Sequence, residues 1–139
     1  MTIRHFSAVL LTAALLATIA GCSDNGTDPT TGGGTGTTVS FAADLQPVFN
    51  ATCTGCHGAG GFGGLDLTTD VAWANLLGVE SMGYAPRQRV VSGNPDESVL
   101  YLKINGDPSV GGRMPQGVPL DVDTIELFRV WIVQGALKN

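Results

Sequence analysis

The sequence predicts a small, loop-rich, all-α domain over residues 41–139. Four stretches show the spacing of apolar residues that one face of a helix requires, and none shows the alternation typical of a half-buried strand. Long segments rich in glycine and proline separate these stretches. We therefore expect about four helices joined by irregular loops, which a chain of 139 residues accommodates as one domain.

The first two helices are predicted over residues 42–53 and just after Asp70. The apolar positions of the first share one helix face: Leu45, Val48, Phe49 and Thr52. Pro47 is tolerated only near a first turn, so this helix should begin at 41–44. The second helix is short, with Asp70 as a possible N-cap; it runs through the sequence VAWANLL and stops at Gly78.

The last two helices have clearer start signals. In the third, Asn94 is expected to cap, Pro95 occupies the first helical position, and Glu97 completes a capping box. An Asn-Gly pair at 105–106 ends it. The fourth helix begins at Asp121 and has a broad apolar face before a final glycine: Ile125, Phe128, Trp131 and Ile132.

Residues 1–21 have the pattern of a secretion signal. A short positive start at Arg4 precedes an uncharged, mostly apolar stretch that ends in the sequence IAGC. This stretch, Phe6 to Ala20, has fifteen residues and would span only ~22 Å as a helix. That is short of the roughly 30 Å hydrocarbon core, which argues against a permanent transmembrane helix. The ending IAGC resembles the lipobox of bacterial lipoprotein signals, which implies that Cys22 becomes the lipidated first residue of the mature protein. Ser23 resembles residues that permit sorting to the outer membrane.

Residues 22–40 are predicted to be this lipidated cysteine and a flexible tether. Glycine, threonine, aspartate and proline dominate, and almost no side chain here would enter a core. Eighteen flexible residues have an r.m.s. span of ~23 Å, which would hold the domain near a membrane and let it reorient.

Three reactive side chains lie within five positions, in the sequence CTGCH at 53–57. A thioredoxin-like redox pair needs a βαβ context, which the helical pattern lacks. A zinc knuckle needs four nitrogen or sulfur ligands, and Cys56 and His57, as neighbours, do not easily reach one ion together. A plain disulfide between Cys53 and Cys56 is a third alternative. The spacing is also that of a c-type haem attachment site.

Haem attachment gives each residue of the motif a chemical role. Two cysteines three positions apart lie on the same side of a helical turn, so their sulfurs can reach the two vinyl groups of a porphyrin. His57 then extends toward the iron as proximal ligand. One haem c per chain also accounts for every cysteine, because Cys22 is lipidated while Cys53 and Cys56 become thioethers. No thiol is then left to oxidise outside the cytoplasm.

With these motifs the chain resembles the class I cytochromes c, and more narrowly the planctomycete-type single-haem cytochrome c domain. The matching stretches are FAADLQPVFNATCTGCHG, GGLDL, SGNPDESVLYLKI, GGRMPQG and IELFRVWIVQGA, which together span nearly all of 41–136. The resemblance implies the cytochrome c fold, with about four helices around a covalently bound haem. It also implies that the first and last helices cross beside the haem, with Phe49 and Trp131 as contacts there.

The sixth iron ligand separates an electron carrier from a haem enzyme. His57 is the only histidine left once residues 1–21 are removed, so a second histidine ligand is excluded within one chain. Of the two remaining methionines, Met82 is expected to be a core filler. Met114 lies in GGRMPQG, a poor place for packing that resembles the family's axial-methionine loop. We therefore expect Met114 as distal ligand, with Met82 or an open position as alternatives.

Weaker candidates for contact with the haem are three arginines and two aromatic residues. Arg87, Arg89 and Arg113 would pair with haem propionates, and Tyr84 or Trp73 would donate hydrogen bonds to them. For each one, a solvated charge or an ordinary buried aromatic ring is an equally good interpretation.

The run of glycines from Gly58 to Gly64 does not have the context of a phosphate-binding loop. No strand precedes it and no G-K-[ST] follows it. We expect these glycines to allow close approach of the backbone to the porphyrin. A carbonyl among residues 61–65 is expected to accept a hydrogen bond from the His57 ring nitrogen opposite the iron.

Together these features predict an electron carrier, not an enzyme, on the periplasmic side of a bacterial membrane, with the outer membrane slightly favoured. A His/Met pair raises the reduction potential and closes the iron to substrates. The alternatives are a peroxidase-like or gas-sensing haem domain with an open sixth position, and a cytochrome subunit of a larger oxidoreductase complex. The sequence offers no candidate catalytic residue, such as a distal histidine.

The charge of the chain bears on its partners. The formal net charge of −5 becomes −6 without residues 1–21, because six basic residues then stand against twelve acidic ones. An acidic domain without a basic cluster argues against nucleic acid. The expected partners are redox proteins and, through the lipid on Cys22, a membrane. The lysine-poor surface departs from cytochromes that dock through a basic rim.

Overall fold

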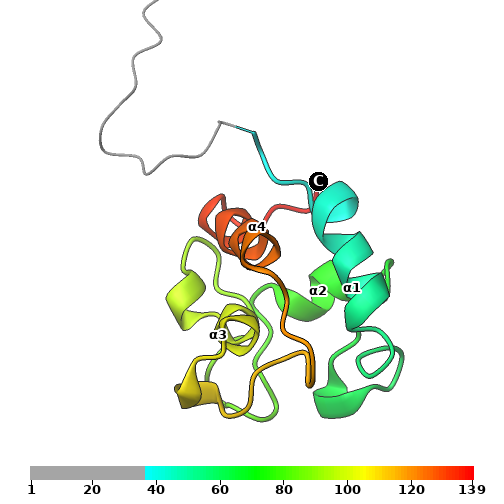
Figure 1. Cartoon of the computed structure of the whole chain (residues 1–139), viewed down its shortest axis with the longest axis vertical. Helices are drawn as coiled ribbons and strands as arrows, with labels where there is room; N and C mark the ends of the chain where they lie inside the picture. Colours follow the sequence, from blue (N-terminus) through cyan, green and yellow to red (C-terminus); the bar gives the residue numbers. More distant parts are fainter. Residues whose placement is uncertain (1–36) are drawn as a thin grey trace, which may run out of the picture. The chain divides into compact units, whose positions relative to one another are not determined.

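The computed structural model describes residues 37–139 (Figure 1), so the expected signal at 1–21, Cys22 and most of the tether lie outside the described residues. The described part contains no β-strand, only two isolated bridges, and the predicted all-α, loop-rich class is confirmed there. No helix of this part has the length and apolar character needed to cross a membrane. The α-helices are α1 (Gln46–Thr52), α2 (Ala72–Leu76), α3 (Val99–Asn105) and α4 (Val122–Val133). The shorter helical segments are η1 (Phe41–Leu45), η2 (Phe62–Gly64), η3 (Pro95–Glu97) and η4 (Pro108–Val110).

The first helix starts at Phe41, within the range that Pro47 predicted. It begins as the π-helix η1, in which the N–H of Gln46 donates to the Phe41 carbonyl, and it continues directly as α1. Pro47 has no N–H to donate, so it is tolerated in the first turn of α1, directly after this wider turn. The hydroxyl of Ser40 caps this start by accepting the N–H of Ala43 at 3.1 Å.

The second helix, α2, has a different start from the predicted one. Its first residue is Ala72, and the flanking Val71 makes no side-chain cap, so the N-cap role expected for Asp70 is wrong. The N–H groups of Val71 and Ala72 donate instead to the Thr68 carbonyl, which gives the helix a backbone turn in place of a cap. Its end agrees with the prediction, because Gly78 has a φ of 69°, a conformation that glycine adopts without strain.

The third predicted helix is divided by Ser98. Residues Pro95–Glu97 form the 3₁₀ turn η3, and α3 begins at Val99 after Ser98 in an extended conformation. The predicted capping box is wrong, because the Asn94 side chain makes no cap hydrogen bond. The Ser98 hydroxyl donates to the Asn94 carbonyl at 2.7 Å and accepts the Val91 N–H at 2.9 Å. These two bonds hold Ser98 out of the helix.

The fourth helix, α4, begins where the sequence predicts. The Asp121 carboxylate accepts both the N–H and the hydroxyl of Thr124, each at 2.8 Å. Gly135, with a φ of 101°, lies just beyond its end. Three of the four predicted apolar positions are buried, Phe128, Trp131 and Ile132.

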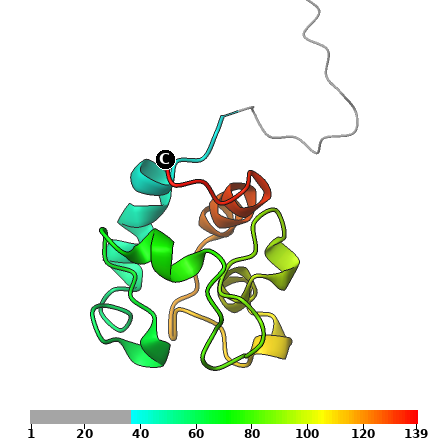
Figure 2. The ribbon, with the colours of Figure 1, turned by 180° about the vertical axis from the view of Figure 1, so that it is seen from behind.

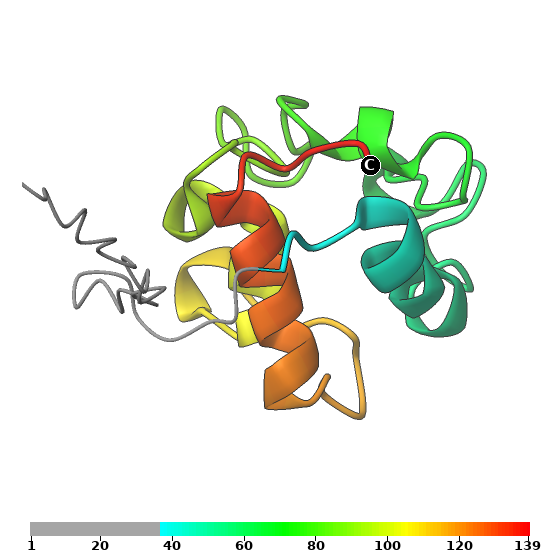
Figure 3. The same ribbon diagram turned by 90° about the horizontal axis from the view of Figure 1, so that it is seen from above.

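The first and last helices meet through four aromatic rings, all buried. The ring centroids of Phe41 and Trp131 lie 5.3 Å apart, as do those of Phe49 and Phe128. The helix α3 packs against α4 from the other side, so that α4 runs between α3 and the η1–α1 segment (Figure 3). The expected contact between the first and last helices is present. In this contact Phe49 pairs with Phe128, and Trp131 pairs with Phe41.

Residues 37–41 are held by the last residues of the sequence. The Val39 N–H donates to Gln134 Oε1, and the Phe41 N–H donates to Asn139 Oδ1, both at 2.9 Å. The C-terminal segment runs beside the start of η1, on the side of the domain where α2 also lies (Figure 2). Residues 37–40, which the sequence assigned to the tether, therefore include residues that contact the domain.

Candidate functional site

The sequence CTGCH forms a turn directly after α1. The N–H groups of Cys56 and His57 both donate to the Cys53 carbonyl, at 3.1 and 2.8 Å. Both cysteines are free, not joined in the disulfide alternative, and Cys53 is half-buried against the core while Cys56 is exposed. Burial raises the pKa of the Cys53 thiol to about 11, because a thiolate there would lose its hydration. One compact turn thus presents two thiols and an imidazole.

A backbone carbonyl orients the His57 ring. Nδ1 of His57 lies 3.1 Å from the carbonyl oxygen of Phe62, within the 61–65 range expected for this partner. A carbonyl oxygen can only accept, so Nδ1 carries the proton. The lone pair is then on Nε2, the nitrogen that remains free to bind a metal ion.

The turn that supplies this carbonyl depends on glycine. A Cβ on Gly61 would lie 2.6 Å from the Cys56 carbonyl oxygen and 2.8 Å from the His57 Cα, distances that no side chain tolerates. At Gly61 the backbone therefore lies close to the CTGCH turn at 53–57, which we call the Cys-His turn; the sequence had predicted a close approach to the porphyrin instead. Gly63 and Gly64 follow with φ values of 66° and 61°, in the left-handed region that favours glycine.

Arg89 is buried, with 7% of its surface exposed. It contacts the same turn, Phe62–Gly64, which we call the glycine turn. Its NH2 donates to the carbonyls of Gly63 and Gly64, at 3.2 and 3.0 Å, and its NH1 donates to the Asn75 carbonyl at 2.8 Å. Sequence reasoning proposed a haem propionate as its partner and missed this role. One feature of the sequence could have indicated this role: Arg89 directly precedes two valines, Val90 and Val91, whose apolar side chains favour burial.

The other propionate candidates also have protein partners. The Trp73 ring N–H donates to the Ala136 carbonyl at 2.8 Å, and the Tyr84 hydroxyl donates to a backbone carbonyl at Val110. Arg113 donates to the Asn105 carbonyl at 2.6 Å. The donor hydrogens that were assigned to a propionate from Trp73 and Tyr84 are thus already in use.

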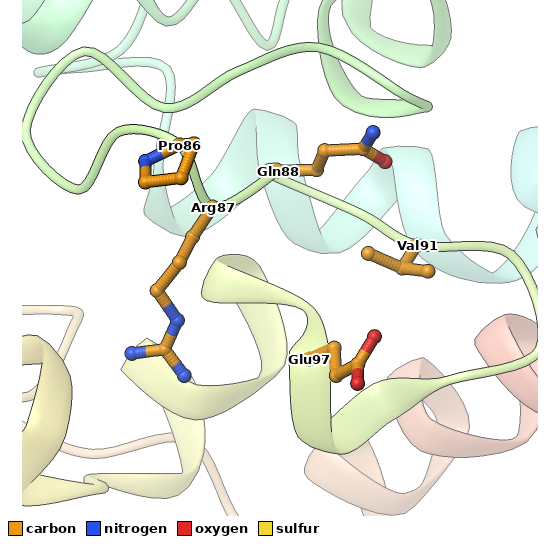
Figure 4. Close-up of a pocket in the computed structure, with 5 residues that line it drawn as sticks. All are labelled: Pro86, Arg87, Gln88, Val91 and Glu97. Atoms are coloured by element: carbon orange, nitrogen blue, oxygen red, sulfur yellow. The ribbon is translucent and has the colours of Figure 1, made fainter.

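Arg87 points into a hollow that is separate from the Cys-His turn. The hollow measures about 440 Å³, and none of the four expected haem-binding residues lines it (Figure 4). Its lining residues are Pro86, Arg87, Gln88, Val91 and Glu97. Arg87 is half-buried, and its NH1 reaches the Ser109 hydroxyl at 3.3 Å.

The two methionines occupy different surroundings. Met82 is 74% exposed, so the expectation that it fills the core is wrong. Its Sδ lies against Gly64, 2.6 Å from the place that a Cβ there would take. Met114 is half-buried in the loop between η4 and α4, and its N–H donates to the Lys103 carbonyl of α3 at 2.9 Å. Met82 therefore lies against the glycine turn, whereas Met114 lies in a separate loop that is hydrogen-bonded to α3.

No protein-family model, curated protein or solved structure matches this chain. Within residues 37–139, no group of three or more histidine, cysteine, aspartate or glutamate side chains is placed to hold a metal ion on its own.

Proposed function

We propose that the chain is a membrane-anchored, single-haem c-type cytochrome that carries single electrons between redox partners. The observation that carries this proposal is one turn with two free thiols, Cys53 and Cys56, and a histidine whose Nδ1–H is held by the Phe62 carbonyl. This donor set suits haem, because a porphyrin brings four iron ligands of its own. The protein then needs to supply only the axial ligands and the points of attachment.

The residues of the turn have distinct roles in this proposal. Cys53 and Cys56 would hold the haem through thioether bonds to its two vinyl groups, and such an addition of a thiol to a double bond would need no oxidant. His57 would hold the iron through Nε2, and the Phe62 carbonyl would make that nitrogen a stronger ligand by accepting the hydrogen bond from Nδ1–H. The haem, when bound, supplies an iron that exchanges one electron between its ferrous and ferric states.

Met114 is the proposed second axial ligand, and the surroundings of Met82 support this choice. Met82 lies against Gly64, in the turn that holds the Nδ1 side of the His57 ring. Nε2, the other nitrogen of that ring, would hold the iron. Met114 lies in a loop that is not part of this turn, so it is the methionine that remains to hold the iron together with His57. Ligation by His57 and Met114 would leave no open position for a substrate, which suits a carrier.

The remaining parts of the proposal concern location and partners. Lipid on Cys22 would anchor the protein at the periplasmic side of a bacterial membrane, with the outer membrane slightly favoured. Its macromolecular partners would be redox proteins and not nucleic acid, since the chain carries a net charge of −5. Membership of a larger oxidoreductase complex is compatible with the same chemistry.

Covalent haem is tested by expressing the chain with a c-type maturation system and staining denaturing gels for haem peroxidase activity. The wild-type band should keep its colour, and the double variant Cys53→Ser/Cys56→Ser should lose it. Cys22→Ser is the matched control, because it makes the same change outside the turn and should stay coloured. Colour lost from the wild-type band on denaturation, or zinc in place of iron by elemental analysis, would contradict the proposal.

A further inference from the structure

Arg89 is a buried cation without an anionic partner in the described part of the chain. The only ion pair of residues 37–139 joins Arg129 and Glu126. Burial of a charge is unfavourable unless hydrogen bonds replace its water, and desolvation accordingly lowers the pKa of the Arg89 guanidinium. Such a residue needs compensating contacts, and these show what it holds in place.

The compensating contacts join α2 to the glycine turn. NH1 donates to the carbonyl of Asn75 in α2, while NH2 donates to the carbonyls of Gly63 and Gly64 in η2. A planar guanidinium can span three carbonyls in fixed directions, which an ammonium group at the end of a flexible chain cannot do.

Apart from Arg89, the glycine turn is fixed mainly by its own backbone, because its side chains contribute little packing. Gly63 and Gly64 have no side chains, and the Phe62 side chain is 77% exposed, so it packs against little of the domain. The backbone bonds of the turn are those from the Gly64 N–H to the Gly61 carbonyl at 3.1 Å and from the Leu65 N–H to the Phe62 carbonyl at 3.4 Å. Besides Arg89, the Phe62 N–H ties the turn to the Cys56 carbonyl, at 3.1 Å. The two carbonyls that Arg89 binds directly follow the Phe62 carbonyl, which accepts the Nδ1–H of His57.

We infer that Arg89 is a positioning residue for the His57 ring: it fixes the turn Phe62–Gly64 so that the Phe62 carbonyl keeps its hydrogen bond to Nδ1. The inference rests on the proposed haem function, since the ring matters as an iron ligand. A strong Nδ1–H bond makes the imidazole more basic and favours ferric iron. Arg89 thus holds the reduction potential down through geometry, although a buried positive charge alone would raise it.

The variant Arg89→Lys separates geometry from charge. Lysine keeps the positive charge but cannot bind all three carbonyls, so the turn should loosen. The Nδ1–H of His57 should then exchange with solvent about two- to tenfold faster, which corresponds to losing one ordinary hydrogen bond. The reduction potential should rise. If the charge alone mattered, Arg89→Lys would change neither quantity, and only Arg89→Gln would change the potential, downward.

The exchange rate is measured by NMR on the reduced, diamagnetic haem protein labelled with ¹⁵N-histidine. The label reports on one residue, because His57 is the only histidine after residues 1–21. Arg129→Lys is the matched control: it makes the same change at a side chain of α4 that pairs with Glu126 at 2.7 Å, outside the glycine turn. It should leave both the exchange rate and the potential unchanged.

A second variant covers the case in which Arg89→Lys does not fold. Gly63→Ala keeps Arg89 and adds a methyl group that meets no neighbour within 4 Å, but it strains the turn at a φ of 66°. It should also speed the exchange and raise the potential. A haem-bearing Arg89→Lys protein with both quantities at the wild-type values overturns the role of Arg89, and a haem-bearing Gly63→Ala protein with both unchanged overturns the role of the turn through which Arg89 would act. A chain that never acquires covalent haem contradicts the proposed function instead.

Discussion

Nδ1 of His57 and the carbonyl oxygen of Phe62 lie 3.1 Å apart, and this contact gives the two sides of the imidazole different roles. The Nδ1 side faces the glycine turn, with Met82 lying against Gly64. The Nε2 side carries the lone pair. Because the assignment of the tautomer follows from a carbonyl that can only accept, it holds whatever ligand Nε2 takes.

The Nε2 side of His57 leads to a prediction about Met114. If its thioether is the second axial ligand, the oxidised protein should show the weak charge-transfer band of methionine-ligated ferric haem. The reduced protein should not bind carbon monoxide readily at neutral pH. Met114→Ala should remove the band, lower the potential and open the iron to carbon monoxide, while haem stays on Cys53 and Cys56. Optical spectra and a redox titration measure all of these effects.

Met82→Ala is the matched control for this experiment. Met82 is exposed beside Gly64, so its removal should leave the band, the potential and carbon monoxide binding nearly unchanged. Loss of the band in Met82→Ala alone would keep the carrier function but assign the ligand to Met82. Immediate carbon monoxide binding by the wild-type protein would favour the gas-sensing or peroxidase-like alternative.

The two cysteines of the turn should differ in reactivity before haem is attached. Burial raises the pKa of Cys53 to about 11, so roughly one thiol in a thousand is ionised at pH 8. Cys56 is exposed, so iodoacetamide should alkylate it first, and the rate at Cys53 should rise as pH approaches 11. Peptide mass spectrometry of the haem-free chain follows both sites. In denaturant the two rates should become similar, whereas similar rates in native buffer would argue against the burial of Cys53.

The cap of α4 should make a pH-dependent contribution to stability. Hydrogen bonds from the N–H and hydroxyl of Thr124 lower the pKa of the Asp121 carboxyl below its ordinary value. A carboxylate with a lowered folded-state pKa stabilises the protein above its unfolded-state pKa, and the stabilisation disappears as pH falls through the folded-state value. Asp121→Ala should therefore lower Tm by a few degrees at pH 7. The difference should shrink below about pH 4.

Asp70→Ala is the control for this prediction, since Asp70 does not cap α2. Thermal unfolding followed by circular dichroism should give it nearly the wild-type Tm at both pH values. A Tm difference for Asp121→Ala that stays constant down to pH 3 would mean that the ionised cap is not its source.

The proposed lipid anchor gives a prediction about Cys22. Cys22→Ser should shift the protein from the membrane fraction to the soluble fraction, or leave it unprocessed, because serine offers no thiol for lipidation. Cell fractionation with immunoblotting measures both results. Ser23→Ala, which changes the neighbouring residue and keeps the thiol, should still be processed and found with membranes. A Cys22→Ser protein that is processed normally and still pellets with membranes would contradict the proposal that the chain is a lipoprotein.

Several features of the fold and site could be predicted because their causes are local. Pro47 restricts where a helix can start, Asp121 offers a carboxylate to the N–H groups of a first turn, and glycine ends α4. The CTGCH turn and the range of its carbonyl partner follow from spacing along a few residues. Hydrogen bonds between near neighbours in sequence decide each of these features.

Other local signals were present, but different contacts between near neighbours in sequence replaced the predicted ones. The sequence predicts a capping box from Asn94, Pro95 and Glu97. Instead, the Ser98 hydroxyl accepts the Val91 N–H, and the helix is interrupted at Ser98. Asp70 stands before an apolar run, yet the backbone of Thr68 supplies the turn. A cap competes with other partners for the same N–H groups, and the sequence does not rank those partners.

The sequence by itself determined the all-α class, the start and end of α4, and the grouping of two thiols and an imidazole in one turn. Only the tertiary structure decided that Arg89 binds Gly63 and Gly64, that Trp73 donates to Ala136, and that Met82 is exposed. The physical reason is the range of the interactions. Bonds within a turn are fixed by spacing along the chain, whereas the partner of a long side chain depends on which distant backbone segment packing brings within reach of it.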